Sequence, residues 1–368
     1  MKKVLVVITT AFVSWGGLTN AFMNYYRKMD MKGLCIDVVS MNEAEQSLLD
    51  ELSRNNGRYY RLPDKRTNTW QYLKCFFKLC KGYDVVHVHG NSSTMAGELL
   101  LAKIQGVNIR IAHCHTNKCM HPILNRLCTP ALLYSQTICL AVSEEASWVY
   151  GKHSYTVFKN TIDTNKYGFS EKKREAIREK YGISRDEIVI GHCGKIYEAK
   201  NHQFLVKVFA KIHEKNEKTK LFLVGDGILR KQIEQQIQIL KLDEFVVFTG
   251  MQSDTSEFFS AMDYFMFPSI YEGFPLALLE AQSAGLECMA SEHVPRKTNV
   301  TGNVRYLKLD EDLWKETFYK RYNVNDRKKR GENARKKIVQ EGYDSYDAAQ
   351  RLKSIYLGTS LEYGENAQ

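Results

Sequence analysis

Residues 264–281 read YFMFPSIYEGFPLALLEA, a stretch that places a strand, a loop and a helix in immediate succession. Tyr264–Phe267 is a continuous apolar run, which is typical of a parallel strand covered on both faces. Pro275 is predicted to be the first helical residue, because its fixed φ suits that position. Glu272 then falls in the loop and Glu280 inside the helix. A strand that leads through a short loop into a helix is the repeating unit of α/β folds.

The same alternation of strands and helices extends over the whole chain. Other apolar runs predict strands at Val4–Ile8, Cys35–Ser40, Val85–His89, Arg110–His115, Ile188–His192, Leu221–Val224 and Phe245–Phe248. A charged, turn-rich stretch at residues 170–186 separates two series of these strands. We therefore predict two doubly wound Rossmann-like α/β domains, residues 1–165 and 166–342. Ligands should bind at the carboxyl ends of the strands, in a crevice between the two domains.

The composition is that of a globular protein: 44% of the 368 residues are hydrophobic and 26% are charged. Nine cysteines without a CxxC pair indicate a reduced, cytoplasmic setting. The apolar run Val4–Val13 is interpreted as a first strand rather than a leader, because no small-x-small cleavage site precedes Trp15. No apolar run reaches the length of a membrane span.

Most of the net charge of +10 falls in the first half of the chain, and much of it in residues 54–81, here called the basic segment. Its cations are Arg54, Arg58, Arg61, Lys65, Arg66, Lys74, Lys78 and Lys81. Aromatic residues lie between them, a pattern that favours attraction to an anionic membrane surface. A solvated helix face is the alternative. No nucleic-acid-binding signature accompanies the charge, so a nucleic acid partner is not expected.

Glycines and lysines follow several predicted strands. Gly16 and Gly17 allow a ligand to approach the start of the next helix, although the GxGxxG pattern of a dinucleotide site is absent. In the second domain, Lys195 and Lys200 flank the end of a strand and the start of a helix, a position that suits a diphosphate. Gly225 belongs to another turn at a strand end.

Two pairs of histidines also occur at strand ends, and the period of two puts each pair on one face. They are His87 with His89 and His113 with His115. We expect them to offer hydrogen bonds into a polar cleft. A zinc site that adds Cys114, Cys119 and His121 is disfavoured, because Cys114 points to the opposite face and the spacing matches no structural zinc pattern. Asp310–Asp312 is interpreted as the cap of a helix rather than a metal site.

The two carboxylates of the opening stretch are predicted to have different roles. Glu272 lies at the mouth of the helix, where it can meet the reacting end of a ligand, whereas Glu280 can reach a diol further along. Free backbone amides of Gly273, Phe274 and Leu276 lie between them and are expected to face the crevice.

With these residues the chain resembles the family-4 glycosyltransferases, retaining enzymes of the GT-B fold. The spacing from Glu272 to Glu280 is the most specific motif, and Asn91–Gly97 with Arg110–His113 is similar to the branch that builds capsular and exopolysaccharides. The resemblance implies an acceptor-binding first domain and a donor-binding second domain. It also implies that a C-terminal helix, about residues 343–368, packs back on the first domain.

For the donor, the resemblance implies that Lys195 and Lys200 hold the diphosphate and that Glu280 binds the ribose hydroxyls. Glu272 would contact the transferred sugar, helped by the loop from Gly273 to Leu276. Lysine at position 195, where the family commonly has arginine, gives a point charge in place of a bidentate fork.

For the acceptor, the resemblance implies that His115 lies at the junction of sugar and acceptor. His89, Asn91 and His113 would lie on the acceptor side. The loop Gly16-Gly17 would line the donor and acceptor side of the crevice.

The implied reaction is transfer, with retention, of a sugar from a nucleotide-diphosphate donor, expected to be UDP-linked. The acceptor would be a glycan or a polyprenyl-diphosphate-linked glycan, used at the inner face of the cytoplasmic membrane in surface polysaccharide biosynthesis. No metal cofactor is expected. The alternatives are a GT-B sugar-nucleotide epimerase or phosphorylase, and a non-catalytic glycan- or nucleotide-binding partner.

Overall fold

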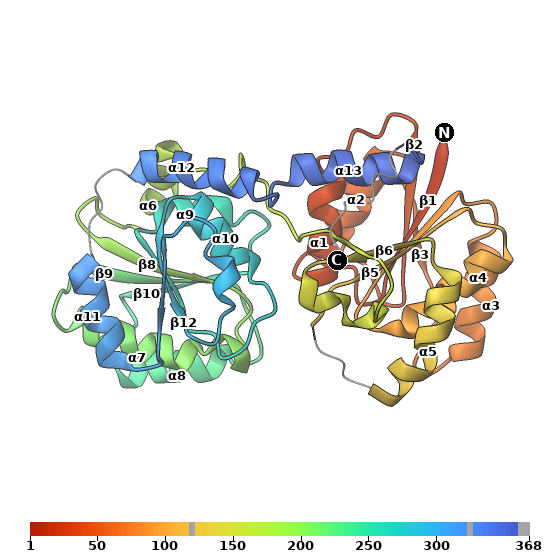
Figure 1. Ribbon diagram of the computed structural model, residues 1–368. Helices are drawn as coiled ribbons and strands as arrows, with labels where there is room; N and C mark the ends of the chain where they lie inside the picture. The colour runs from red at the N-terminus through yellow and green to blue at the C-terminus, as the bar shows by residue number, and fades with distance from the viewer. Residues whose placement is uncertain (118–121, 322–326, 360–368) are drawn as a thin grey trace. The chain divides into compact units, whose positions relative to one another are not determined.

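The computed structural model describes residues 1–117, 122–321 and 327–359, and the chain divides into two compact units (Figure 1). Unit 1 comprises Met1–Thr161 and the chain from Ser345 onward, and unit 2 comprises Ile162–Asp344. The boundary expected after residue 165 thus falls a few residues beyond the observed one.

Unit 1 contains a parallel sheet with the strand order β3-β2-β1-β4-β5-β6-β7. Its strands are β1 (Lys2–Ile8), β2 (Leu34–Ser40), β3 (Tyr59–Arg61), β4 (Val85–Gly90), β5 (Ile109–Cys114), β6 (Ile138–Ala141) and β7 (Thr156–Val157). Its helices are α1 (Gly17–Tyr26), α2 (Gln46–Arg54), α3 (Thr69–Leu79), α4 (Ala96–Ile104), α5 (Pro122–Ser135) and α13 (Ser345–Leu357). The strand order reverses between β1 and β4, which marks the topological switch point where ligands bind in such sheets.

Each face of this sheet carries its own hydrophobic core. On one face, Phe22 of α1 and Tyr356 of α13 pack with apolar strand residues, and α13 lies beside α1 (Figure 1). On the other face, Tyr72 and Phe76 of α3 pack with Leu99 of α4. Because both faces are covered, the strands are buried and read as continuous apolar runs.

Unit 2 contains a second parallel sheet with the strand order β10-β9-β8-β11-β12-β13. Its strands are β8 (Ile188–Cys193), β9 (Thr219–Val224), β10 (Val246–Gly250), β11 (Tyr264–Phe267), β12 (Glu287–Ser291) and β13 (Val304–Leu307). Its helices are α6 (Glu171–Lys180), α7 (His202–His213), α8 (Arg230–Ile239), α9 (Ser256–Ala261), α10 (Leu276–Ser283), α11 (Glu311–Arg321) and α12 (Arg327–Gln340). The switch point of this sheet lies between β8 and β11.

All eight predicted strands are confirmed to within a few residues, whereas the sequence interpretation missed β3, β6, β7, β12 and β13. The missed strands have five residues or fewer, so their periodicity is too short to stand out. Pro275 was wrongly expected inside the helix. Its ψ of 102° is extended, so it caps α10, which begins at Leu276. None of the described helices combines the length and apolarity needed to cross a bilayer.

Candidate functional site

An ion pair joins the loops that follow the two strands at the switch point of unit 2. The Nζ atom of Lys200, after β8, lies 2.5 Å from Oε1 of Glu272, after β11. The two side chains are only 13% and 11% exposed. The backbone N–H of Ile270 donates to the carbonyl of Ala199, which ties the loops together. The structure therefore brings together two residues that the sequence assigned to the same site.

Glu280 lies half-buried in α10, among groups that the sequence did not single out. Burial raises the pKa of its carboxyl to about 7, although a hydrogen bond with Tyr167 and the charge of Lys166 oppose the shift. Asp254 repels the ionised form and adds to the rise. These neighbours come from separate parts of the chain, and no local motif announces them. Glu280 is therefore able to change its charge near neutral pH.

The thiol of Cys193, the last residue of β8, lies close enough to both parts of the site to sense their charges. Burial raises its pKa, the Glu280 carboxylate raises it further, and the Lys200 ammonium lowers it. Glu280 and the Lys200–Glu272 pair thus surround the same strand end. Lys195 leaves the same strand in the loop before Lys200, with its side chain exposed.

The start of α10 offers backbone donors beside Glu272. Among the described residues, the N–H groups of Gly273 and Phe274, in the loop before α10, and of Leu276, in its first turn, have no hydrogen-bond acceptor. The Phe274 ring stacks on Tyr343 at a centroid distance of 5.1 Å, which holds the loop in place. Such amides are suited to an anion or to sugar oxygens.

Gly225 has a packing role that the sequence interpretation did not foresee. Its φ is +133°, and a Cβ atom there would lie 2.2 Å from the carbonyl oxygen of Gly194. Glycine therefore allows the loops after β8 and β9 to approach one another. This contact shapes the loop that carries Lys195 and Lys200.

Substitution of Gly225 by alanine is expected to lower the free energy of unfolding by about 2–5 kcal/mol, from the clash with Gly194 together with backbone strain. Hydrogen exchange of the peptides of unit 2, followed by mass spectrometry of the whole chain in increasing urea, measures the change. Gly273→Ala is the matched control, since a Cβ atom there has no neighbour within 4 Å. Equal stability of the two variants would contradict the packing role.

In unit 1, the predicted glycine loop lies between β1 and α1. Gly16 is the N-cap of α1, where a Cβ atom would come within 3.1 Å of the Val13 carbonyl oxygen. Gly17 has open space instead, with nothing within 4 Å of its Cβ position. Gly16 thus meets a packing need, and Gly17 leaves room at the helix N-terminus. Asn91 lies exposed after β4, on the other side of the switch point.

The four histidines at the ends of β4 and β5 form one cluster. Nδ1 of His89 lies 2.9 Å from Nε2 of His115, and Nε2 of His87 lies 3.3 Å from Nδ1 of His113. The hydroxyl of Tyr356, on α13, lies 2.7 Å from Nδ1 of His87. The predicted sharing of a face is confirmed, and the cluster extends across both strands to the C-terminal helix.

Burial decides what these histidines can do. His87, His89 and His113 have no exposed surface, and burial lowers the pKa of each ring, that of His113 to about 3. His115 is half-buried, and burial lowers its pKa too. The acceptor contact expected of His89 and His113 is thus not open to these side chains as they lie here. They can act only through His115.

Within the described ranges, His87, His89 and His113 are also the group whose nitrogens could hold a metal ion, since these atoms lie within 4.8 Å of one another. Two of the rings are joined by a hydrogen bond. Cys119 and His121 lie outside the described residues. Asp310 accepts a hydrogen bond from the N–H of Leu313, which confirms that it caps α11. The expectation of a metal-free site stays a prediction.

The basic segment is less uniformly charged than its sequence indicates. Lys65 forms an ion pair of 2.7 Å with Glu98, which is fully buried in α4, and Arg61 pairs with Glu43 at 3.0 Å. These acids come from elsewhere in unit 1 and neutralise two of the predicted surface cations. The second half of the segment is α3, as the sequence predicts.

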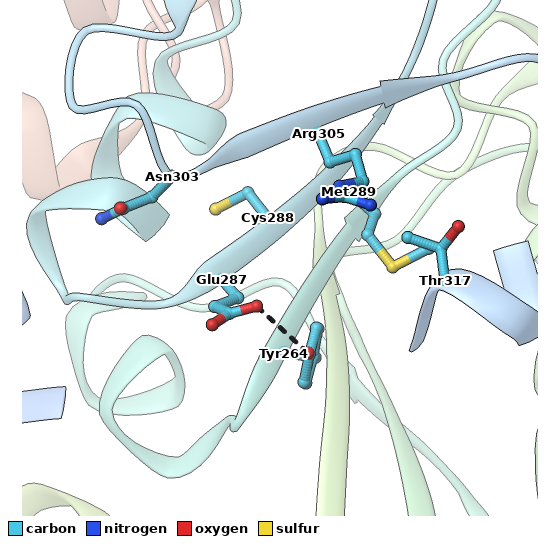
Figure 2. Close-up of a pocket in the computed structure, with 7 residues that line it drawn as sticks. All are labelled: Tyr264, Glu287, Cys288, Met289, Asn303, Arg305 and Thr317. Atoms are coloured by element: carbon cyan, nitrogen blue, oxygen red, sulfur yellow. Dashed lines mark hydrogen bonds between the residues drawn. The ribbon is translucent and has the colours of Figure 1, made fainter. Parts of the chain in front are cut away.

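A small pocket lies at the amino ends of the unit 2 strands, whereas the candidate site lies at their carboxyl ends (Figure 2). The pocket is therefore not part of this site. It is lined by Tyr264, Glu287, Cys288, Met289, Asn303, Arg305 and Thr317. Tyr264 and Glu287 are the first residues of β11 and β12, and their side chains are hydrogen-bonded at 3.2 Å. Residues at the amino ends of parallel strands contribute to stability more often than to ligand binding.

Three comparisons relate the chain to known proteins. The family model "Glycosyl transferases group 1" matches residues 173–312, which include Lys195, Lys200, Glu272 and Glu280. The chain is 28% identical to the "Putative glycosyltransferase EpsF" of Bacillus subtilis (strain 168), over 96% of each chain. It is 25% identical to the "UDP-Gal:alpha-D-GlcNAc-diphosphoundecaprenol alpha-1,3-galactosyltransferase" of Escherichia coli, over 77% of this chain and 78% of the relative.

The fold matches the crystal structure of Anabaena Alr3699/HepE in complex with UDP, with a TM-score of 0.75 and 16% identity. The match covers 97% of this chain and all of that one. Both parallel-sheet units described above therefore have counterparts in a protein of known structure.

Proposed function

We propose that this chain is a group 1 glycosyltransferase with the GT-B fold, and that it transfers a sugar, with retention, from a UDP-sugar to a glycan or polyprenyl-diphosphate-linked glycan. The product would be a surface polysaccharide or its lipid-linked precursor. A lipid-linked acceptor would bring the protein to the inner face of the cytoplasmic membrane.

The observation that carries this proposal is the Lys200–Glu272 pair beside the free amides of Gly273 and Phe274 in the loop before α10 and of Leu276 in its first turn. The diphosphate of a donor is negatively charged, and Lys200 would bind it together with Lys195 of the same loop. Glu272 would then be released to accept hydrogen bonds from the hydroxyls of the transferred sugar. Preorganised charges of this kind are the largest contribution to many enzymatic rate enhancements.

Cleavage of the bond between the anomeric carbon and the diphosphate leaves negative charge on the departing group. The two lysines and the backbone donors of α10 would stabilise that charge without a metal ion. In same-face attack, the departing phosphate oxygen takes the proton of the acceptor hydroxyl. The reaction then needs no dedicated carboxylate base, and none is assigned.

Unit 1 would supply the acceptor side. Of the predicted residues there, His115 is half-buried and Asn91 exposed, so these two side chains have surface with which to touch a ligand. His89 would hold the ring of His115 through their 2.9 Å contact, and Gly17 leaves room for the substrate at the start of α1.

A panel of nucleotide sugars tests the proposal directly. A UDP-sugar should raise the melting temperature, because a ligand that binds only the native state stabilises it by mass action. The same donor should support transfer to a glycan acceptor in the presence of EDTA, with the anomeric configuration retained. Stabilisation by no nucleotide sugar, or dependence of transfer on a divalent cation, would contradict the proposal.

The donor affinity is expected to rise with pH. Because the pKa of Glu280 is raised to about 7, the fraction of its carboxylate form grows between about pH 6 and about pH 8. The carboxylate accepts hydrogen bonds from ribose hydroxyls more strongly than the neutral acid does. Kd of the UDP-sugar should therefore fall as the pH increases through this range, as measured by isothermal titration calorimetry.

Glu280→Gln should weaken donor binding at the upper pH by about 1.5–3 kcal/mol, which is typical of a lost hydrogen bond to a charged group. It should also remove the pH dependence. The matched control is Glu287→Gln, since Glu287 lies at the amino end of its strand in the same sheet, away from the site (Figure 2). An unchanged pH dependence in Glu280→Gln would exclude Glu280 as the ribose ligand.

A further inference from the structure

The loop that follows β4, residues 91–95, lies at the topological switch point of unit 1 and is here called the β4–α4 loop. It carries the exposed amide of Asn91 and the half-buried side chains of Ser92 and Thr94, whose hydroxyl oxygens lie 2.8 Å apart. All three groups are uncharged, and each of them can both donate and accept hydrogen bonds. The loop is therefore suited to the hydroxyls of a sugar.

Lys65, in the connection between β3 and α3, holds one side of this loop. Its Nζ atom lies 2.9 Å from the carbonyl oxygen of Thr94, and 2.7 Å and 2.9 Å from Oε1 and Oε2 of Glu98 in the first turn of α4. An ammonium group has three N–H donors, and these three oxygens match them. Lys65 therefore has no donor left for an anionic ligand, and it fixes the loop to the start of α4.

The carboxylate that pairs with Lys65 is fully buried, which is rare for a charged group. Besides Lys65, the hydroxyl of Tyr72 on α3 donates to Oε1 of Glu98 at 2.7 Å. Apolar side chains of the same volume often stabilise a protein as well as a buried ion pair does, because desolvation of the two charges offsets their attraction. Apolar side chains cannot, however, donate a hydrogen bond that fixes the direction of the Thr94 carbonyl. The pair therefore contributes position to the loop more than stability to the fold.

Helix α5 holds the other side of the β4–α4 loop. The backbone N–H of Ser93 donates to Oδ1 of Asn125 at 2.8 Å, and the hydroxyl of Ser93 lies 2.8 Å from that of Thr129. Ser93 is fully buried between these contacts. Two consecutive residues of the loop, Ser93 and Thr94, are thus attached to different parts of unit 1. Lys65 supplies one of these two attachments.

We propose that Lys65 is a positioning residue for the acceptor, which holds the β4–α4 loop where its side chains bind the sugar hydroxyls of the acceptor. The binding groups are the side chains of Asn91, Ser92 and Thr94. The loop does not bind a phosphate, since Lys65 has no free donor. This deepens the proposed function and rests on it, because it assigns the sugar of the acceptor to one loop of unit 1. Hydrogen bonds to a substrate depend on placement, and a displacement of about 1 Å can lower a rate about 10²-fold.

Steady-state transfer by Lys65→Met to a glycan acceptor tests the proposal. The KM for the glycan should rise about tenfold or more, because the loop loses one of its attachments. The glycan carries no diphosphate, so a rise in its KM reports contacts with sugar hydroxyls. Kd of the UDP-sugar should stay unchanged, since the residues proposed to bind the donor lie in unit 2. Hydrogen exchange of the peptide that covers residues 91–95 should become faster in the variant.

A triple variant separates positioning from stability. Lys65→Met alone leaves Glu98 as a buried carboxylate without its cation, and it should lower the melting temperature. Lys65→Met/Tyr72→Phe/Glu98→Met removes every polar group of the cluster and should recover that temperature. Its KM for the glycan should stay high, because the Thr94 carbonyl still has no donor. If KM recovers together with the melting temperature, Lys65 acts on stability alone and the proposal is overturned.

Lys103→Met is the matched control, because Nζ of Lys103 also donates to a backbone carbonyl, that of Tyr134, at 2.8 Å. Lys103 lies in the last turn of α4, at the end away from the loop. The KM of this variant for the glycan should equal that of the unchanged protein.

The failure of this proposal can be told apart from the failure of the proposed function. If the unchanged protein transfers the sugar and Lys65→Met keeps the same KM for the glycan, the positioning role alone fails. An equal rise of KM in Lys103→Met would also overturn it. If no UDP-sugar stabilises the unchanged protein and no transfer occurs, the proposed function fails, and the acceptor role of the loop fails with it.

Discussion

Replacement of Lys200 by methionine is expected to lower kcat/KM for sugar transfer by about 10²–10³-fold, the usual cost of losing one group that stabilises developing negative charge. Glu272→Gln should have an effect of similar size, because its carboxylate is proposed to hold the transferred sugar. Steady-state transfer with a UDP-sugar measures both. Lys207→Met, in an exposed position on α7, is the matched control and should leave kcat/KM unchanged.

Breaking the ion pair is also expected to lower the stability of the single variants. Its side chains are only 13% and 11% exposed, so removal of one partner leaves the other charge poorly solvated, at a cost of about 1–3 kcal/mol in the free energy of unfolding. The double variant Lys200→Met/Glu272→Gln leaves neither charge alone and should recover much of that stability while staying inactive. Folded single variants with full kcat/KM would exclude both residues from catalysis.

Acidification is expected to unfold unit 1 before unit 2. Burial lowers the pKa values of His87, His89, His113 and His115 in unit 1 and of His192, His202 and His213 in unit 2, that of His202 to about 4. Each ring is neutral when folded and takes up a proton on unfolding once the pH is below the unfolded pKa near 6.5. The stabilisation is therefore complete above that pH and declines as the pH falls.

The size of the effect follows from proton linkage. Between about pH 7.5 and about pH 5.5, each such histidine lowers the free energy of unfolding by at most about 1–1.5 kcal/mol, which amounts to about 4–6 kcal/mol for the four in unit 1 and about 3–4 kcal/mol for the three in unit 2. Glu280 acts in the opposite direction. Its pKa of about 7 in the folded protein lies above that of an unfolded glutamate, so the folded form takes up a proton at a higher pH than the unfolded form does. This uptake raises the free energy of unfolding of unit 2 by about 2 kcal/mol over the same pH range and offsets part of the loss from its histidines.

Hydrogen exchange by mass spectrometry in increasing urea, corrected for the effect of pH on intrinsic exchange rates, resolves the two units. Unit 1 should lose most of its protection at the lower pH, and His113→Asn should show a smaller pH dependence. The exposed His153, replaced by asparagine, is the control and should leave that dependence unchanged. Equal stability of unit 1 at both pH values would contradict the prediction.

The separate parts of the candidate site could be predicted from the sequence, because each is encoded in contiguous residues. Strand β11, its loop with Glu272 and the helix with Glu280 occupy a single stretch of the chain. Lys200 follows the strand at the other side of the switch point, and parallel strands deliver their following loops to one edge. The neighbours of Glu280 could not be found in this way, since Tyr167 and Asp254 reach it from distant segments.

Local sequence determined the α/β class, the order of the long strands and the residues at their carboxyl ends, because periodicity and turn chemistry act over a few residues. Tertiary structure decided which of those residues are accessible and which charges are compensated. It buried His89 and His113, paired Lys65 with Glu98, and left Ile123 and Leu127 of α5 exposed. Solvation and charge pairing depend on groups far apart in the chain, which only the folded protein brings together.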